Sequence, residues 1–136
     1  MSGRDGSTGY LMLTVQVQGE NTAVVRLPQQ VDFDNASAVG AQCEDLVQRG
    51  LTTLVVDASG TEYLDSSGVT MLITLSRTTQ ARSGTLYLAA FNSHYQQIWH
   101  MLGLETVIPL FPTVPAALSV SDARDPAAAP GVSDRV

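Results

Sequence analysis

Two serine hydroxyls stand where a helix is expected to begin. Asp65, Ser66, Ser67 and Gly68 come directly before the apolar sequence Val-Thr-Met-Leu-Ile. Small and acidic residues at a helix entrance place free backbone N–H groups and the positive end of the helix dipole beside those hydroxyls. Asp and Ser are also ordinary helix caps, and Gly68 can serve only to permit close packing. Local chemistry alone therefore favours capping and leaves a functional interpretation open.

Other residues that could carry chemistry lack the partners they would need. Asp57 ends an apolar run, but a phosphoacceptor aspartate would require an acidic pair after the first strand and a Lys near the last, and the chain has no Lys at all. His94 and His100 lie six residues apart on one expected helix, which places them on different faces. The single Cys43 falls on the apolar face of its helix, which favours a buried, inert thiol. No metal site of the usual four-ligand kind is indicated.

Apolar periodicity predicts the elements that must position these residues. A β hairpin is expected from 10–18 and 22–27, because both runs are β-branched and a polar turn, Gly19-Glu20-Asn21, joins them. Further strands are predicted at 52–58, 85–90 and 106–111. Helices are predicted at 35–49 with Asp34 as N-cap and Gly50 after its end, at 67–81, at 93–102 closed by Gly103, and at 114–120.

The order β-β-α-β-α-β-α-β-(α) predicts an α/β fold. A hairpin followed by alternating helices and strands gives a mixed sheet with a parallel part and right-handed crossovers. Pro109 restricts the last strand to an edge of that sheet. Trp99, Ile98 and Leu102 have core spacing on the third helix.

Length and composition limit the class of protein. The 136 residues fit one domain, expected at 10–120, with flexible tails at 1–9 and 121–136. Thirteen acids against seven arginines give a net charge of −6, which argues against nucleic acid or an anionic membrane as a partner. No apolar run approaches the roughly 18 residues of a membrane span, and the first ten residues have no signal-peptide pattern. A cytoplasmic location is expected.

The segment from Leu54 to Gly68 (LVVDASGTEYLDSSG) resembles the sulfate-transporter and anti-sigma-antagonist (STAS) domain, and in particular the small bacterial anti-sigma factor antagonists. The hairpin, the positions of Asp32 and Ala36 at the first helix, and the sequence Met101-Leu102-Gly103-Leu104 match the family's layout in order and spacing. The tetrad Asp-Ser-Ser-Gly is the specific part. The resemblance covers nearly the whole folded region and implies a STAS-like mixed sheet with packed helices.

The resemblance also implies a function. In that family the serine after the Asp is phosphorylated by an anti-sigma factor that is itself a serine kinase, which carries the role to Ser66, with Ser67 as the alternative. Asp32, Asp65, Ser67, Gly68 and Thr70 would lie on the docking face. The chain departs from the family in having no Gly before Asp32 and in having Thr70 where a second Gly is common.

The chain is thus expected to be a non-enzymatic antagonist without a cofactor. It would bind the kinase when Ser66 is free and release it when Ser66 is phosphorylated, so that a sigma factor is regulated. A serine phosphatase would reverse the modification. A phosphate on Ser66 is expected to be held by the helix N-terminus.

Two alternatives remain. The first is a STAS scaffold or subunit of a stress-signalling or lipid-transport assembly, without phosphorylation. The second is a small enzyme with a serine nucleophile, for which the sequence offers no base beside the tetrad and no Gly-x-Ser-x-Gly elbow.

Overall fold

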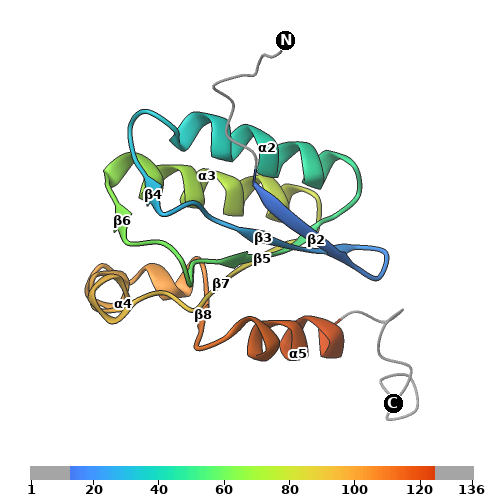
Figure 1. The fold of residues 1–136 in the computed structure, drawn as a ribbon. Coiled ribbons are helices and arrows are strands. Elements are labelled where there is room, and N and C mark those ends of the chain that lie inside the picture. The colour runs from blue at the N-terminus through green and yellow to red at the C-terminus, as the bar shows by residue number, and fades with distance from the viewer. Residues whose placement is uncertain (1–12, 125–136) are drawn as a thin grey trace.

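The structure is a computed structural model that describes residues 13–124 (Figure 1). Its strands are β2 (Thr14–Gln18), β3 (Thr22–Arg26), β4 (Gln30–Val31), β5 (Thr53–Asp57), β6 (Tyr63–Leu64), β7 (Thr85–Ala89) and β8 (Leu110–Phe111). Its helices are α2 (Ala36–Gln48), α3 (Ser66–Ala81), α4 (Ser93–Met101), the 3-10 helix η1 (Leu104–Thr106) and α5 (Val114–Arg124).

The main sheet has the predicted mixed topology. Its strand order is β2-β3-β5-β7-β8, with β2 antiparallel to β3 and the remaining neighbours parallel. Val24, Val55 and Tyr87 stand in register across its centre. The central strands are buried on both faces, as the continuous apolar sequence of β5 predicts. The hairpin, the α/β class and the edge position of the last strand are confirmed.

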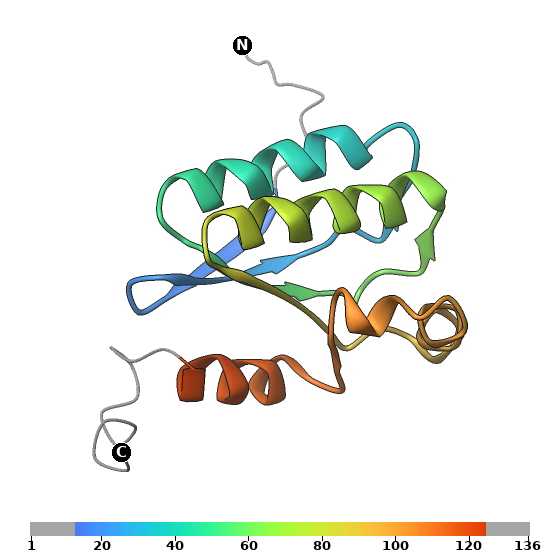
Figure 2. The ribbon, with the colours of Figure 1, turned by 180° about the vertical axis from the view of Figure 1, so that it is seen from behind.

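Helices cover both faces of the sheet (Figures 1 and 2). On one face α2 and α3 lie side by side and bury Val39, Val47 and Leu72 against the strands. On the other face α5 packs Ala117 against Val24 and Tyr87. Each face therefore has its own apolar layer, which is the usual way in which an α/β sheet is stabilised. Within residues 13–124, none of the helices combines the length and apolar composition that crossing a membrane would require.

A second, two-stranded sheet was not predicted. β4 and β6 pair in parallel, with Gln30 opposite Tyr63 and Val31 opposite Leu64. Strands of two residues carry no measurable alternation, so periodicity cannot reveal them. This small sheet lies between the ends of the main strands and the starts of α2 and α3, and it sets where both helices begin (Figure 1).

Several predicted details are wrong. The N-cap of α2 is Asn35 and not Asp34, because Asp32 folds the preceding residues into a turn. The predicted strand 106–111 is reduced to Leu110–Phe111, because η1 ends at Thr106 and the chain then turns at Val107 before the strand begins. Leu102 is 63% exposed and lies outside the core, since the helix ends at Met101 and the chain turns at Gly103, whose φ is +69°.

The last helix is longer than predicted. It runs to Arg124, four residues into the segment that was expected to be a tail, and it buries Ser121. The predicted tail at 1–9, the first residues of the predicted hairpin and residues 125–136 lie outside the described residues.

Candidate functional site

The site begins at the N-terminus of α3, which Asp65 caps. Asp65 Oδ1 accepts hydrogen bonds from the backbone N–H groups of Ser67 at 2.8 Å and Gly68 at 3.2 Å. The capping interpretation of the tetrad is therefore confirmed for Asp65. Ser66 is the first residue of the helix and is exposed, whereas Ser67 is partly buried. Asp65 therefore caps α3 while the next residue, Ser66, is exposed.

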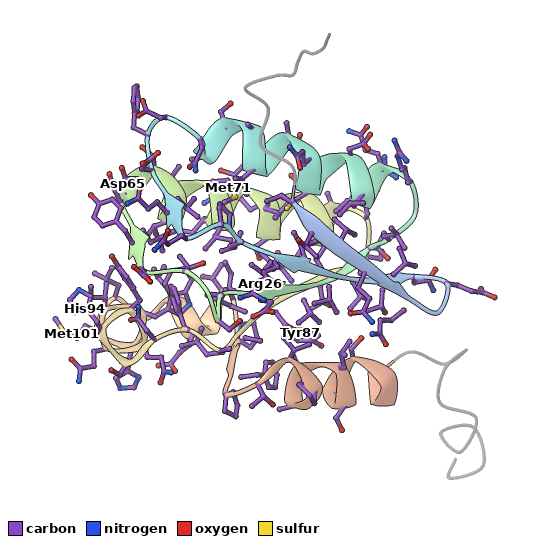
Figure 3. The ribbon with its side chains drawn as sticks, viewed as in Figure 1. Arg26, Asp65, Met71, Tyr87, His94 and Met101 are labelled. Atoms are coloured by element: carbon purple, nitrogen blue, oxygen red, sulfur yellow. The ribbon has the colours of Figure 1, made fainter. Side chains whose placement is uncertain are left out.

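The second oxygen of Asp65 ties this helix start to the loop before α2. Asp65 Oδ2 accepts from the N–H of Phe33 at 3.0 Å, and the Asp65 N–H donates to the carbonyl of Val31 at 3.1 Å. Asp32 shapes the same loop, because its Oδ1 accepts from the N–H groups of Asp34 and Asn35. The structure thus brings the loop of Asp32 beside the tetrad, at the end of the molecule where Figure 3 labels Asp65.

Close packing fixes the approach of α3 to the small sheet. A Cβ at Gly68 would lie 2.4 Å from Leu64 Cδ1 and 3.1 Å from Val31 Cγ1, so only glycine fits without movement. The Leu64 N–H donates to the hydroxyl of Tyr95 at 3.0 Å. Tyr95 in turn stacks on Phe91, with ring centroids 5.5 Å apart. The strand that leads into Ser66 is therefore held by α4 as well as by β4.

A groove runs from this helix start between α2 and α3. Its volume is about 570 Å³, and it opens to solvent beside Ser66. The groove is lined by Phe33, Ala36, Ser37, Gly40, Ala41 and Glu44 on one side and by Ser66, Ser67, Thr70, Met71, Thr74 and Leu75 on the other. We call it the α2–α3 groove. Thr70 lies one turn after Ser66 and is exposed, so three of the predicted docking residues share one surface.

Phe33 is the residue of this site that the sequence did not single out. Its side chain is 81% exposed, the largest exposed fraction among the large apolar residues of the described part. A single aromatic residue in a polar loop has no spacing that would mark it. Its place at the site becomes apparent only from the structure, in which its loop lies beside Asp65.

The other candidate residues lie elsewhere. Asp57 ends β5 and accepts from the N–H of Ser59 at 2.9 Å, which confirms a strand-end role. Cys43 is buried, and desolvation raises the pKa of its thiol to about 12, as expected for an inert cysteine. His94 is exposed and lies against Tyr95.

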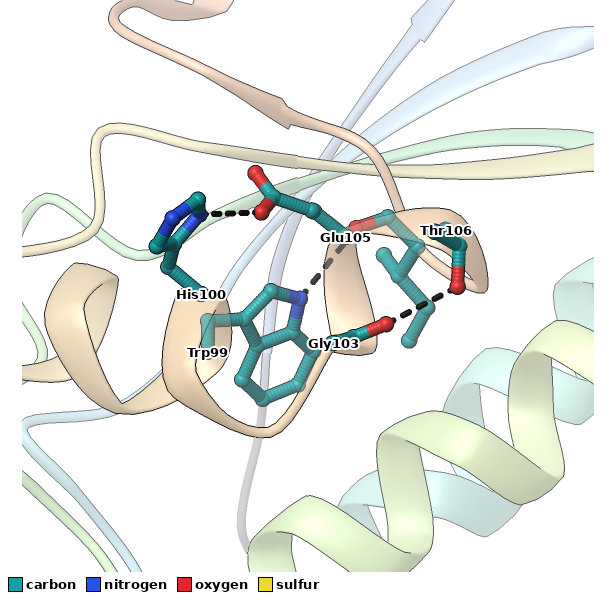
Figure 4. Close-up of polar contacts among 6 residues, drawn as sticks. Trp99, His100, Gly103, Glu105 and Thr106 are labelled. Atoms are coloured by element: carbon teal, nitrogen blue, oxygen red, sulfur yellow. Dashed lines mark hydrogen bonds and ion pairs between the residues drawn. The ribbon is translucent and has the colours of Figure 1, made fainter.

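His100 pairs with a residue close to it in the chain. Its ring contacts the carboxylate of Glu105, while Trp99 Nε1 donates to the carbonyl of Ile108 at 3.2 Å (Figure 4). Both histidines are exposed. Within residues 13–124, no cluster of three or more His, Cys, Asp or Glu is arranged to hold a metal ion.

Fold and site together define the class of protein. Residues 13–117 match the model of the STAS domain family, and the chain belongs to that family. No curated protein matches the sequence.

The chain is similar in structure to the anti-sigma factor antagonist SpoIIAA in its unphosphorylated form, with a TM-score of 0.70 and 19% identity over 81% of this chain and 96% of that one. The phosphorylated form of SpoIIAA from Bacillus gives a TM-score of 0.66 and 20% identity over 81% and 99%. An anti-sigma factor antagonist from Mycobacterium paratuberculosis gives 0.68 and 24% over 80% and 92%.

The same fold also occurs as part of a much larger protein. The murine anion transporter Slc26a9 matches with a TM-score of 0.59 and 20% identity, over 77% of this chain and 18% of the transporter. These likenesses show the fold.

Proposed function

We propose that the chain is an anti-sigma factor antagonist that binds an anti-sigma factor with serine kinase activity while Ser66 is unmodified. Phosphorylation of Ser66 would end that binding, a serine phosphatase would restore it, and sigma-factor-dependent transcription would be regulated as a result. The observation that carries the proposal is the exposed Ser66 side chain at the first residue of α3, beside the α2–α3 groove.

The similar structures support the choice of class. They include an anti-sigma factor antagonist in both unphosphorylated and phosphorylated forms, and this chain covers nearly the whole of each. A protein with this fold therefore exists in two modification states. We place the modification of the present chain at Ser66, with Ser67 as the less accessible alternative.

The transfer itself needs a nucleotide and a base from the partner. The Ser66 Oγ–P bond would form as the terminal phosphoryl bond of ATP breaks, ADP would leave, and the hydroxyl proton would pass to a base of the kinase. Within the described residues, Ser66 and Ser67 have no hydrogen bond to a histidine. We therefore infer that the chain acts as a non-enzymatic binding module, and that ATP is the kinase's cofactor.

The geometry changes one expectation about the phosphate. The N–H groups of Ser67 and Gly68 already donate to Asp65, so a phosphate on Ser66 would have to compete with that carboxylate for these two donors. A phosphate on Ser66 would add about −1.5 to −2 charge beside that carboxylate and would remain in solvent. The fold would accept it because Ser66 is exposed, and the local surface would become strongly negative.

That added charge is large enough to act as a switch. A partner acid about 6 Å from a phosphate of charge about −2 would be repelled by roughly 1.4 kcal/mol in water and about 5.5 kcal/mol at an effective dielectric near 20. Since about 1.4 kcal/mol is tenfold in affinity, binding would weaken by about tenfold to more than a thousandfold.

Mass spectrometry tests the modification. The chain is incubated with ATP and each purified anti-sigma kinase encoded in the same genome, and the peptide that carries the tetrad is sequenced. We expect one phosphate on Ser66, retained in Ser67→Ala, lost in Ser66→Ala and removed by a serine phosphatase. Phosphate at another residue, or on none with every kinase, would contradict the proposal.

A STAS scaffold or subunit of a larger assembly is the second candidate. The scaffold or subunit role is favoured by the match to the anion transporter Slc26a9, because the matched region is only 18% of that protein. Co-purification separates the two candidates. A stable assembly with unmodified Ser66 would favour a stress-signalling or lipid-transport role, whereas recovery of a kinase with phosphorylated Ser66 would favour the antagonist. Both candidates are compatible with the cytoplasmic location that we propose.

A further inference from the structure

The α2–α3 groove extends well beyond Ser66. Its lining residues recur at the same spacing on both helices, from Ala36 to Glu44 and from Ser66 to Thr74. Eight residues of helix correspond to about 12 Å, so the groove could take about two turns of a helix from another protein. The contact of Phe33 with Asp65 shows that the two helices begin at the same end of the molecule.

The floor of the groove is apolar and its walls are low. Met71 and Leu75 are buried at its base, and the α2 side is built from Ala36, Gly40 and Ala41. A Cβ at Gly40 would lie 2.9 Å from Met71 Cγ, so glycine lets the two helices approach closely there. An apolar side chain of moderate size could therefore enter without displacing a residue of this chain.

The described lining of the groove carries negative charge. Within the described part of the chain, Glu44 is the only ionisable residue that lines the groove, and no Arg of that part lines it. Glu44 Oε2 accepts from the Thr78 hydroxyl at 3.4 Å. Among residues 13–124, ion pairs involve Asp45 and Glu105, and none involves Glu44. At the other end, the loop that carries Phe33 adds the acids Asp32 and Asp34.

An exposed aromatic at the mouth completes the surface. Aromatic side chains, Phe among them, are enriched in protein interfaces relative to the rest of the surface. Phe33 is presented to solvent by a loop that Asp65 and Asp32 hold in place. It therefore offers a large apolar contact beside Ser66, and it is not a residue of the hydrophobic core.

We propose that the α2–α3 groove is the docking surface for a basic, amphipathic segment of the kinase that modifies Ser66. An apolar side chain of that segment lies over Met71, a Lys or Arg faces Glu44, and Phe33 contacts it at the mouth. This inference rests on the proposed function. A nucleic acid or a second copy of this chain fits less well, because the chain carries a net charge of −6 and the groove is acidic.

Two pairs of variants test the groove. Ala41→Leu fills it from an exposed helical position, and Ala81→Leu makes the same change at the exposed end of α3. Glu44→Lys reverses the charge in the groove, and Asp45→Lys does so at the next residue, which is exposed and pairs with Arg49. Binding of the cognate kinase, identified with the unmodified chain, is measured by titration calorimetry after circular dichroism has confirmed folding.

We expect Ala41→Leu and Glu44→Lys each to weaken binding at least tenfold, and both control variants to stay within twofold of the original chain. If both groove variants bind normally and Ser66→Asp loses binding, the α2–α3 groove is not the docking surface, but the proposed function is still supported. Tighter binding by Glu44→Lys would overturn the basic character of the segment. If Ser66→Ala and Ser66→Asp bind equally well and both groove variants bind weakly, charge at Ser66 does not control binding. That result would contradict the proposed function and support the groove as the docking surface.

Discussion

At the residue scale, one carboxylate organises the site. Asp65 uses one oxygen to cap α3 and the other to hold the loop of Phe33. The exposure of Ser66 and the placement of Phe33 therefore depend on the same side chain. This dual use explains why a residue that first suggests ordinary capping also belongs to the surface that we propose for partner binding.

Replacing Asp65 should cost stability. We expect Asp65→Ala to lower the free energy of unfolding by about 1 to 2 kcal/mol, because the helix loses its cap and the Phe33 N–H loses its acceptor. Asp34→Ala is the matched control, since Asp34 was the sequence-predicted cap of α2 but does not cap it. Urea denaturation checks both variants, and equal losses in the two would contradict this role of Asp65.

At the scale of elements, periodicity revealed the long segments and missed the short ones. The helices at 36–48, 66–81 and 93–101 and the central strands were predictable, because each buries a regular apolar pattern. The small sheet was not, since two residues on each strand pair only through long-range contacts. The tetrad marked Ser66, but the α2–α3 groove and Phe33 depend on how two helices lie side by side, which spacing along one helix does not encode.

The strand that precedes Ser66 depends on a contact from α4. We expect Tyr95→Phe to expose the Leu64 amide to faster hydrogen exchange and to lower the free energy of unfolding by about 1 kcal/mol, because Leu64 is buried and its N–H loses its acceptor. The ring contact with Phe91 is kept. Tyr63→Phe, at an exposed position, is the control. Unchanged exchange at Leu64 would show that α4 does not hold this strand.

At the scale of the whole molecule, the residues that stabilise the fold are separate from the residues that form the candidate site. The apolar layers on the two faces of the sheet provide stability, and the site uses helix starts and loops at one end. Phosphorylation at such a place can change the surface charge without disturbing the core. This separation supports a binding switch in which the folded state persists in both forms.

Global stability should depend on pH through the buried thiol. Burial raises the pKa of Cys43 from 9.0 to about 12 in the folded chain. Between these values the unfolded chain binds fewer protons, so the free energy of unfolding should fall as the pH rises above about 9, and this contribution should be constant below it.

Urea denaturation from pH 7 to 10.5 measures this effect against Cys43→Ala. The variant should be less stable at pH 7, because it loses buried volume, and the difference should shrink as the pH rises. A difference that stays constant across this range would show that Cys43 does not titrate on unfolding.

The central claim is that a phosphate on Ser66 decides whether the partner stays bound. Titration calorimetry of the cognate anti-sigma kinase with unmodified and with fully Ser66-phosphorylated chain measures this most directly. We predict that the phosphorylated chain binds at least tenfold more weakly, with the same thermal unfolding behaviour as the unmodified chain. Equal affinities of the two forms would contradict the account.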